Sequence, residues 1–214
     1  MSNVVSQSCF AIIGEFENLP AIVRRQGYFV ILQRVNDFFK ESFLDELILT
    51  EDNKVVGLLK SAENLMKIVL MIKNEFYPLQ VRFGIGVSNQ LGTYDIVYDL
   101  AENALVEIET LRHKKESALL DVMLRLHDVD AVQESSLNTI MKLLYLLEQN
   151  WTDKQRRLIH LMIFENMTQV TIAQELNVSA SNVQQMLKNG NYFAYRDTID
   201  TVENLLNRIF HEAV

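Results

Sequence analysis

Apolar and polar residues follow two different patterns along this chain, and the change comes near residue 130. Before it, short apolar runs typical of strands alternate with segments whose apolar residues recur at helical spacing. The predicted strands are CFAIIGEF (9–16), the two halves of a hairpin at 46–60 and LQVRFGIGVS (79–88), and the predicted helices are 20–45, 61–76 and 95–112. Residues 118–126 fit either a last strand or a short helix, and residues 136–214 have helical spacing throughout.

This order of elements predicts an α/β (α+β) fold, in which helices cover an antiparallel sheet of the ferredoxin-like or nucleotide-cyclase-like kind. We predict that this domain spans residues 1–130 and that an all-α domain spans 136–214, because the polar segment HDVDAVQES (127–135) separates the two patterns. Gly84 and Gly86 lie inside a predicted strand, where they indicate a bend or a close approach of another backbone.

The segment QVTIAQELNVSASNVQQMLK (169–188) meets the local requirements of a helix-turn-helix. Ala173 is small enough for two helices to pack closely. Asn177 tolerates the positive φ of the turn, and Ser179 can cap the second helix. In the preceding helix at 152–164, Thr152 and Gln155 have the spacing of a capping box. The alternative is a helical packing module with no role in nucleic-acid binding.

If the second helix of this motif enters a major groove, its amide and hydroxyl side chains can reach base edges. The helix offers one cation, so its attraction to phosphates is weak, and three cations of the preceding helix can add contacts to the DNA backbone. The predicted DNA-binding residues are Lys154, Arg156, Arg157, Ser179, Ser181, Asn182, Gln184, Gln185 and Lys188.

The last predicted helix, 192–211, has apolar residues at alternating spacings of four and three. This spacing is typical of a coiled-coil seam, and a second copy of the chain would double the weak contacts to DNA. The sequence therefore predicts a homodimer through this helix, and it leaves open the alternative that the seam packs on its own chain. The seam residues are Tyr195, Ile199, Val202, Leu206 and Ile209.

Composition limits the remaining possibilities. The net charge is −8, of which residues 1–150 carry −7 and residues 151–214 carry −1, so neither part binds nucleic acid through bulk charge. The single cysteine, Cys9, excludes an internal disulfide, and the four histidines have no metal-ligand spacing. The first apolar run is too short for a signal peptide or a membrane span, so we expect a cytoplasmic protein with no membrane partner.

Several motifs together resemble a known family. These are AIIGEF (11–16), RFGIGVS (82–88), AENAL (101–105) and the helix-turn-helix pattern, and they resemble the SatD family of bacterial proteins. The resemblance implies an N-terminal domain similar to nucleotide cyclases and diguanylate cyclases. In cyclase-type enzymes, an acid on the first strand and an acid at a hairpin hold two Mg²⁺ ions, which steady the triphosphate.

The hairpin LTEDNKVVGLL (49–59) departs from the pattern that the resemblance implies, which is Thr-x-Gly-Asp-Glu-Phe-Gln-Gly-Leu-Leu-like. With Gly57 aligned, Asn53 and Lys54 replace the acidic pair. Further on, Glu102 replaces an arginine. The first-strand acid can be Glu15, but the second is lost. We therefore predict no catalytic residue, no metal and no cofactor. The remaining candidates for binding a small molecule of unknown identity are Glu15, Thr50 and Asp52.

These observations predict a DNA-binding regulatory protein, not an enzyme, with a catalytically inactive cyclase-like domain that senses a ligand or dimerises. Two alternatives stay open. One is a metal-dependent nucleotide-handling enzyme of the cyclase fold, which requires Glu15 and Asp52 to meet across one pocket. The other is a protein-interaction module whose helix-turn-helix no longer binds DNA.

Overall fold

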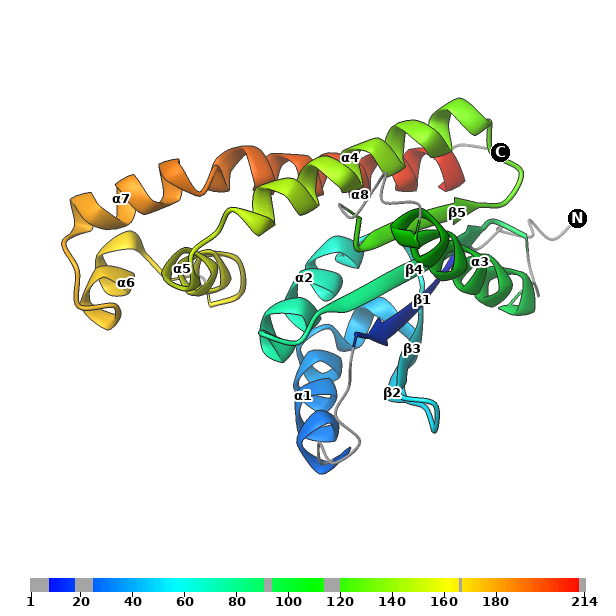
Figure 1. The fold of residues 1–214 in the computed structure, drawn as a ribbon, viewed down its shortest axis with the longest axis horizontal. Helices are drawn as coiled ribbons and strands as arrows, with labels where there is room; N and C mark the ends of the chain where they lie inside the picture. The colour runs from blue at the N-terminus through cyan, green and yellow to red at the C-terminus, as the bar shows by residue number, and fades with distance from the viewer. Residues whose placement is uncertain (1–7, 18–24, 91–93, 114–119, 166, 212–214) are drawn as a thin grey trace, which may run out of the picture.

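A computed structural model describes residues 8–17, 25–90, 94–113, 120–165 and 167–211, which form a mixed α/β structure (Figure 1). Within these residues there are five strands and eight α-helices. The strands are β1 (Cys9–Phe16), β2 (Phe43–Leu49), β3 (Lys54–Leu59), β4 (Val81–Ser88) and β5 (Val122–Leu126). The helices are α1 (Arg25–Phe38), α2 (Leu65–Phe76), α3 (Tyr94–His113), α4 (Ala131–Gln149), α5 (Asp153–Phe164), α6 (Gln169–Glu175), α7 (Ala180–Asn189) and α8 (Tyr192–His211), with a 3-10 turn, η1 (Lys40–Ser42).

The five strands form one sheet in the order β2-β3-β1-β4-β5. Strand β1 lies in the centre and is antiparallel to both of its neighbours, and only β4 and β5 are parallel. In this register Glu15 of β1 lies opposite Lys54 of β3 on one side and Arg82 of β4 on the other. The predicted hairpin is confirmed as β2 and β3, and residues 118–126 contribute a strand, β5.

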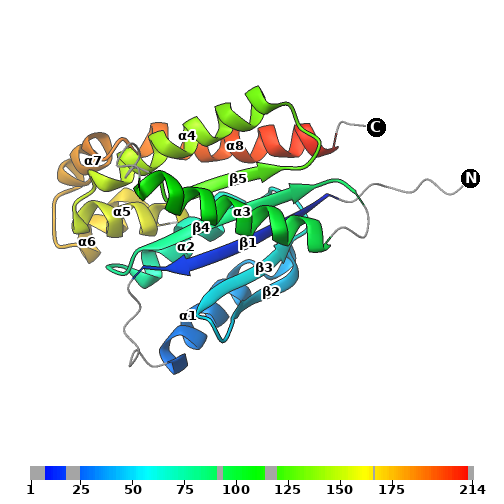
Figure 2. The same cartoon turned by 45° about the vertical axis from the view of Figure 1, so that its right-hand side comes forward.

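Helix α3 covers one face of the sheet, and α1 and α2 cover the other (Figure 2). The packing of α3 explains the two glycines of β4. A Cβ atom on Gly84 would lie 1.9 Å from the carbonyl oxygen of Ala101, and one on Gly86 would lie 1.9 Å from that of Val97. The close backbone approach that the sequence predicted is therefore confirmed, because the α3 backbone rests directly on β4.

Helices α4 and α8 run side by side along the sheet and carry the chain to α5–α7 at one end of the molecule (Figure 1). The Asn138 side chain on α4 donates to and accepts from the backbone of Leu124 in β5, at 3.0 and 2.8 Å. On α8, the Glu203 carboxylate accepts a hydrogen bond from the backbone N–H of Met66, at 3.0 Å. These buried contacts join the C-terminal helices to the sheet and its covering helix α2.

The seam of α8 is buried inside its own chain. Tyr195, Ile199, Val202 and Leu206 are all at most 1% exposed, and Ile209 is partly buried against the same core. Of the two possibilities that the sequence left open for these residues, the packing alternative therefore accounts for the seam. The predicted homodimer remains a prediction, but it needs another surface.

Two predicted boundaries were wrong. The segment 20–45 was expected to be one helix, but α1 ends at Phe38 and β2 begins at Phe43; residues 18–24 lie outside the described part. The edge strand β2 carries two consecutive exposed acids, Asp45 and Glu46. Charged residues on an edge strand interrupt the alternation of apolar and polar residues by which a strand is predicted. Helix α4 begins inside the predicted polar boundary, because Asp130 caps it by accepting from the N–H of Val132 at 2.8 Å. The division into domains at 1–130 and 136–214 remains a prediction.

Candidate functional site

The hairpin tip is held by its own hydrogen bonds. The Thr50 hydroxyl accepts from the backbone N–H of Lys54 at 3.0 Å and donates to the Asp52 carboxylate. This bond from Thr50 lowers the pKa of Asp52. Asn53 adopts a positive φ of 63°, which suits a tight turn. Thr50 and Asp52, two of the predicted ligand-binding residues, thus lie together and satisfy one another.

Each of the two carboxylates on which the alternative of a metal-dependent enzyme depends, Glu15 and Asp52, lies beside a cation. The Lys54 ammonium lies 2.7 Å from one Glu102 oxygen and 3.8 Å from Asp52. On the neighbouring strand, Glu15 pairs with Arg82 at 3.0 Å. Neither Glu15 nor Asp52 lines the cavity described below. In the part of the chain that the structure describes, no three His, Cys, Asp or Glu side chains are grouped so that they could hold a metal ion.

Helices α5–α7 have the local geometry that the sequence predicted. The capping box of Thr152 and Gln155 is confirmed, and so is the cap of α7 by Ser179, which accepts from the N–H of Asn182 at 3.2 Å. Asn177 has a φ of 51°, and Ala173 is buried. On α7 the residues that face the interior are Val183 and Leu187, with Met186 half-buried.

Most of the predicted DNA-binding residues lie exposed on α5 and α7. Lys154 is exposed, and Arg157 is 64% exposed at its side chain while it pairs with Glu175 at 2.8 Å. Gln185 donates to Asn189 on the same helix at 2.7 Å. The exposed positions of α7 and its cap are Ser179, Ser181, Asn182, Gln184, Gln185 and Lys188.

Arg156 differs from the other eight predicted DNA-binding residues, because it turns inward. Its guanidinium lies 4.8 Å from the centre of the Tyr77 ring and 5.6 Å from that of Trp151. It donates to the backbone carbonyl of Glu148 at 3.2 Å and to Asn74 at 3.5 Å. Its position makes Arg156 part of a cavity wall rather than of the exposed face of α5.

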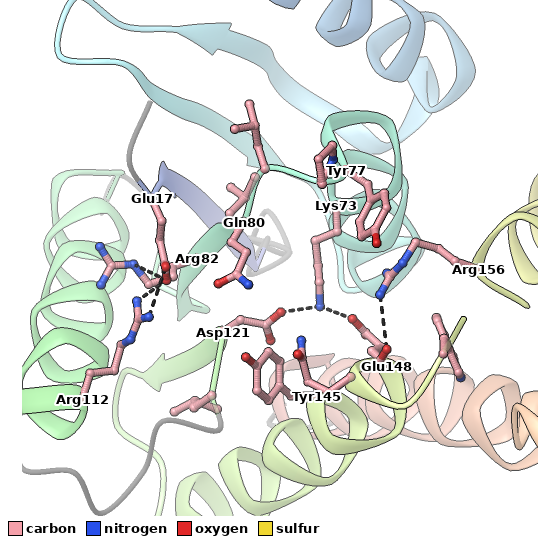
Figure 3. A pocket seen from close by; sticks show the side chains of 16 residues that line it. Glu17, Lys73, Tyr77, Gln80, Arg82, Arg112, Asp121, Tyr145, Glu148 and Arg156 are labelled. Atoms are coloured by element: carbon pink, nitrogen blue, oxygen red, sulfur yellow. Dashed lines mark hydrogen bonds and ion pairs between the residues drawn. The ribbon is translucent and has the colours of Figure 1, made fainter. Parts of the chain in front are cut away.

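The cavity that Arg156 lines has a volume of about 280 Å³ and lies where the sheet meets the C-terminal helices (Figure 3). The end of β1, the starts of β4 and β5, and the C-terminal ends of α2, α3 and α4 supply its walls together with α5. Most of the lining is polar, with four cations and three acids. The charged lining residues are Glu17, Lys73, Arg82, Arg112, Asp121, Glu148 and Arg156.

A buried ion network crosses the middle of this cavity (Figure 3). Lys73 of α2 lies 2.5 Å from Asp121 and also contacts Glu148 of α4. Tyr195 of α8 donates to the same Glu148 carboxylate at 2.6 Å. Burial opposes the charge on Lys73, but the two carboxylates outweigh it and raise the pKa of Lys73. Burial, reinforced by Glu148 and opposed by Lys73, raises the pKa of Asp121 to about 6.

The side of the cavity that β1, β4 and α3 form carries a second set of paired charges. Arg112 of α3 contacts both oxygens of Glu17, and the Arg82 Nε lies 3.6 Å from the same carboxylate. Arg82 also pairs with Glu15 and Glu109. These guanidinium groups are therefore neutralised by neighbouring acids.

The sequence did not predict this cavity. Its charged residues come from seven separate segments between positions 17 and 156, and no two of them form a recognisable local motif. One signal was available: Lys73 interrupts the apolar helix LMKIVLMIKNEF, where a cation facing the core needs a buried acid.

These features define a class of protein fold: the protein is a mixed α/β protein. Its sheet meets a helical C-terminal region around a polar cavity whose charged side chains are mostly paired. Within that class, the chain belongs to the SatD family, whose family model matches residues 9–206. A comparison with curated proteins finds no match. Among the described helices, none combines the length and the apolar character that crossing a membrane requires.

Proposed function

We propose that this protein is a DNA-binding regulator in which α6 and α7 act as a helix-turn-helix. The observation that carries the proposal is the outer face of α7. Its polar residues are exposed while Val183 and Leu187 are fully buried, and the helix lies at one end of the molecule's long axis, away from the sheet (Figure 1). Such a face can approach a groove without rearrangement of the fold, and its amides match the adenine edge.

Few cations are available for phosphate contacts. Lys188 lies on α7, and Lys154 and Arg157 lie on α5, where Glu175 already pairs with Arg157. Binding should therefore be weak for a single chain, and its dependence on salt should be shallow, because few phosphates are neutralised. A second copy of the chain would compensate for this weakness, so the proposal includes a homodimer on DNA.

For the sheet we propose a cyclase-like domain that senses a ligand or dimerises and has no catalytic activity. The order β1-α1-β2-β3-α2-β4, with strands arranged β2-β3-β1-β4, supports the ferredoxin-like and cyclase-like comparison. The Lys54–Glu102 pair at the hairpin supports the loss of activity. We place the protein in the cytoplasm, where a regulator of DNA acts.

The test begins with selection of bound fragments from random DNA by the purified full-length protein. Fluorescence anisotropy on the selected sequence then compares three variants. Gln185→Ala should lose about 1–3 kcal/mol of binding free energy and relax the preference at one base position. Lys188→Ala should weaken binding to all sequences and flatten the salt dependence. Gln33→Ala, an exposed glutamine on α1, should bind as the wild type does.

Two outcomes contradict the proposal. If no fragment is enriched, or if Gln185→Ala and Lys188→Ala behave as Gln33→Ala does on every DNA while remaining folded, α7 does not bind DNA and an interaction module is favoured. If incubation with Mg²⁺ or Mn²⁺ and ATP or GTP gives a cyclic or dinucleotide product that Glu15→Ala abolishes, the sheet domain is an enzyme.

A further inference from the structure

Arg156 is a cation for which the described residues provide no carboxylate at salt-bridge distance. Its hydrogen-bond acceptors are neutral: the Glu148 carbonyl at 3.2 Å and the Asn74 amide oxygen at 3.5 Å, both long for a charge-assisted bond. Its Nε is buried and has no hydrogen-bond partner in the described part of the chain. A buried donor without a partner costs free energy, so a group that accepts from Arg156 would be stabilised there.

The other cations of the cavity are already matched. Lys73 is held by Asp121 and Glu148, and Arg82 and Arg112 share Glu17. The charge left over is thus that of Arg156, at the side of the cavity formed by α5 and the end of α4 (Figure 3).

Two aromatic rings hold the Arg156 guanidinium in place. Tyr77 and Trp151 contact it through cation–π interactions, and Tyr77 is itself tied down, because its hydroxyl donates to Asp153 at 2.7 Å. A guanidinium that is fixed before binding loses little side-chain entropy when it binds a ligand. The planar fork suits an acceptor with two oxygens, which means a carboxylate or a phosphate.

We propose that the 280 Å³ cavity is a binding site for a small oxyanion, in which Arg156 anchors the carboxylate or phosphate group. Gln80, Tyr145 and Gln149 also line the cavity and supply neutral donors for the remainder of the ligand. The proposal does not depend on DNA binding, since the site lies between the sheet and the C-terminal helices and can be tested on the protein alone.

Isothermal titration calorimetry with inorganic phosphate, and separately with acetate, tests the site at constant ionic strength set with sodium chloride. Saturable binding of phosphate, of acetate or of both is expected. Whichever anion binds more tightly identifies phosphate or carboxylate as the preferred group. Arg156→Gln should weaken binding at least tenfold. Arg156→Lys keeps the positive charge but loses the planar fork of donors, so its affinity for the anion should lie between those of the wild type and Arg156→Gln. Lys142→Gln, a half-exposed cation on α4 outside the cavity, should bind as the wild type does.

Circular dichroism of each variant establishes that it is folded. If Arg156→Gln does not fold, the comparison of wild type with Arg156→Lys decides the matter, since a weaker affinity in that variant supports the site. The proposal is overturned if neither anion binds with saturation, or if binding is the same in every folded Arg156 variant as in Lys142→Gln.

Discussion

At the scale of single residues, one ion pair joins the hairpin to α3. In the pattern that the chain resembles, position 54 is acidic and position 102 is an arginine. Here Lys54 and Glu102 occupy these positions, and the ammonium lies 2.7 and 2.9 Å from the two carboxylate oxygens. The pair links β3 to α3, and it places a cation at the position where that pattern has an acid.

Reversing the charge of Lys54 alone should be destabilising. Lys54→Glu would place a fourth carboxylate beside Glu15, Asp52 and Glu102, and we expect it to lower the free energy of unfolding by about 1–2 kcal/mol. The double variant Lys54→Glu, Glu102→Arg should recover most of this loss. Urea denaturation of the two variants and the wild type measures the effect. A double variant no more stable than Lys54→Glu would mean that the pair is not coupled.

Asp121 should give the protein an unusual dependence of stability on pH. Its pKa is about 6 in the folded protein and about 4 in an unfolded chain, so the folded state binds more protons between these values. This group therefore makes the free energy of unfolding fall as pH rises from about 4 to 6. Lys73 adds no slope in that range, because its own pKa is raised and it stays charged.

Urea denaturation at a series of pH values compares wild type with Asp121→Asn. Other carboxylates titrate in both proteins, so the informative quantity is the difference in the free energy of unfolding between wild type and Asp121→Asn. This difference should change between about pH 4 and 6, because the variant lacks the decrease in stability that Asp121 causes in that range. Asp99→Asn, an exposed aspartate on α3, is the matched control and should follow the wild type. A difference that is constant with pH would show that Asp121 does not titrate in this way.

At the scale of elements, the sequence predicted the helices and turns whose formation depends on interactions between residues close together in the chain. The helices α3 and α5, the hairpin, and the turn at Asn177 all depend on residues close together in the chain, through periodicity, caps and a positive φ. Strand β2 was missed in part, because Phe38, Phe39 and Phe43 continue an apolar pattern through the 3-10 turn. The cavity could not be predicted, since its charge pairs depend on which strands are neighbours, and that order is set by the whole sheet.

The contact between α3 and β4 should tolerate no side chain at its two glycines. Gly84→Ala would force a Cβ atom against the Ala101 carbonyl and is expected to lower the free energy of unfolding by about 3 kcal/mol or more. Gly27→Ala is the control, because that position on α1 has nothing within 4 Å of an added Cβ. It should be stabilising by up to about 1 kcal/mol. Thermal and urea unfolding measure both, and equal stabilities would contradict this packing.

At the scale of the whole molecule, α4 and α8 connect the sheet to the helices α5–α7. Their inner faces complete the core that the sheet and α2 begin, and their far ends lead to α5–α7. The two regions therefore share buried side chains, including the network of Lys73, Glu148 and Tyr195. A change at the cavity has a direct structural route to the C-terminal helices.

This arrangement predicts the effect of a charge in the α8 seam. Ile199→Asp should unfold the chain rather than separate a dimer into folded monomers, because Ile199 is 0% exposed within one chain and burying an unpaired carboxylate costs several kcal/mol. Leu205→Asp, at a position 38% exposed on the same helix, should stay folded. Circular dichroism and light scattering follow both variants. If the wild type is dimeric and Ile199→Asp is a folded monomer, the α8 seam forms the dimer interface and this prediction is wrong.

Trp151 gives the molecule a built-in optical reporter. It is the only tryptophan in the chain, so the intrinsic fluorescence excited at the red edge of aromatic absorption comes from one place. Its indole N–H donates to the Gly190 carbonyl at the end of α7 at 2.8 Å, and its ring contacts both Arg156 and Tyr195. Its emission therefore reports on the contact between the cavity and the C-terminal helices. A change in this emission without a loss of the sheet's circular dichroism would indicate that this contact opens while the sheet stays folded.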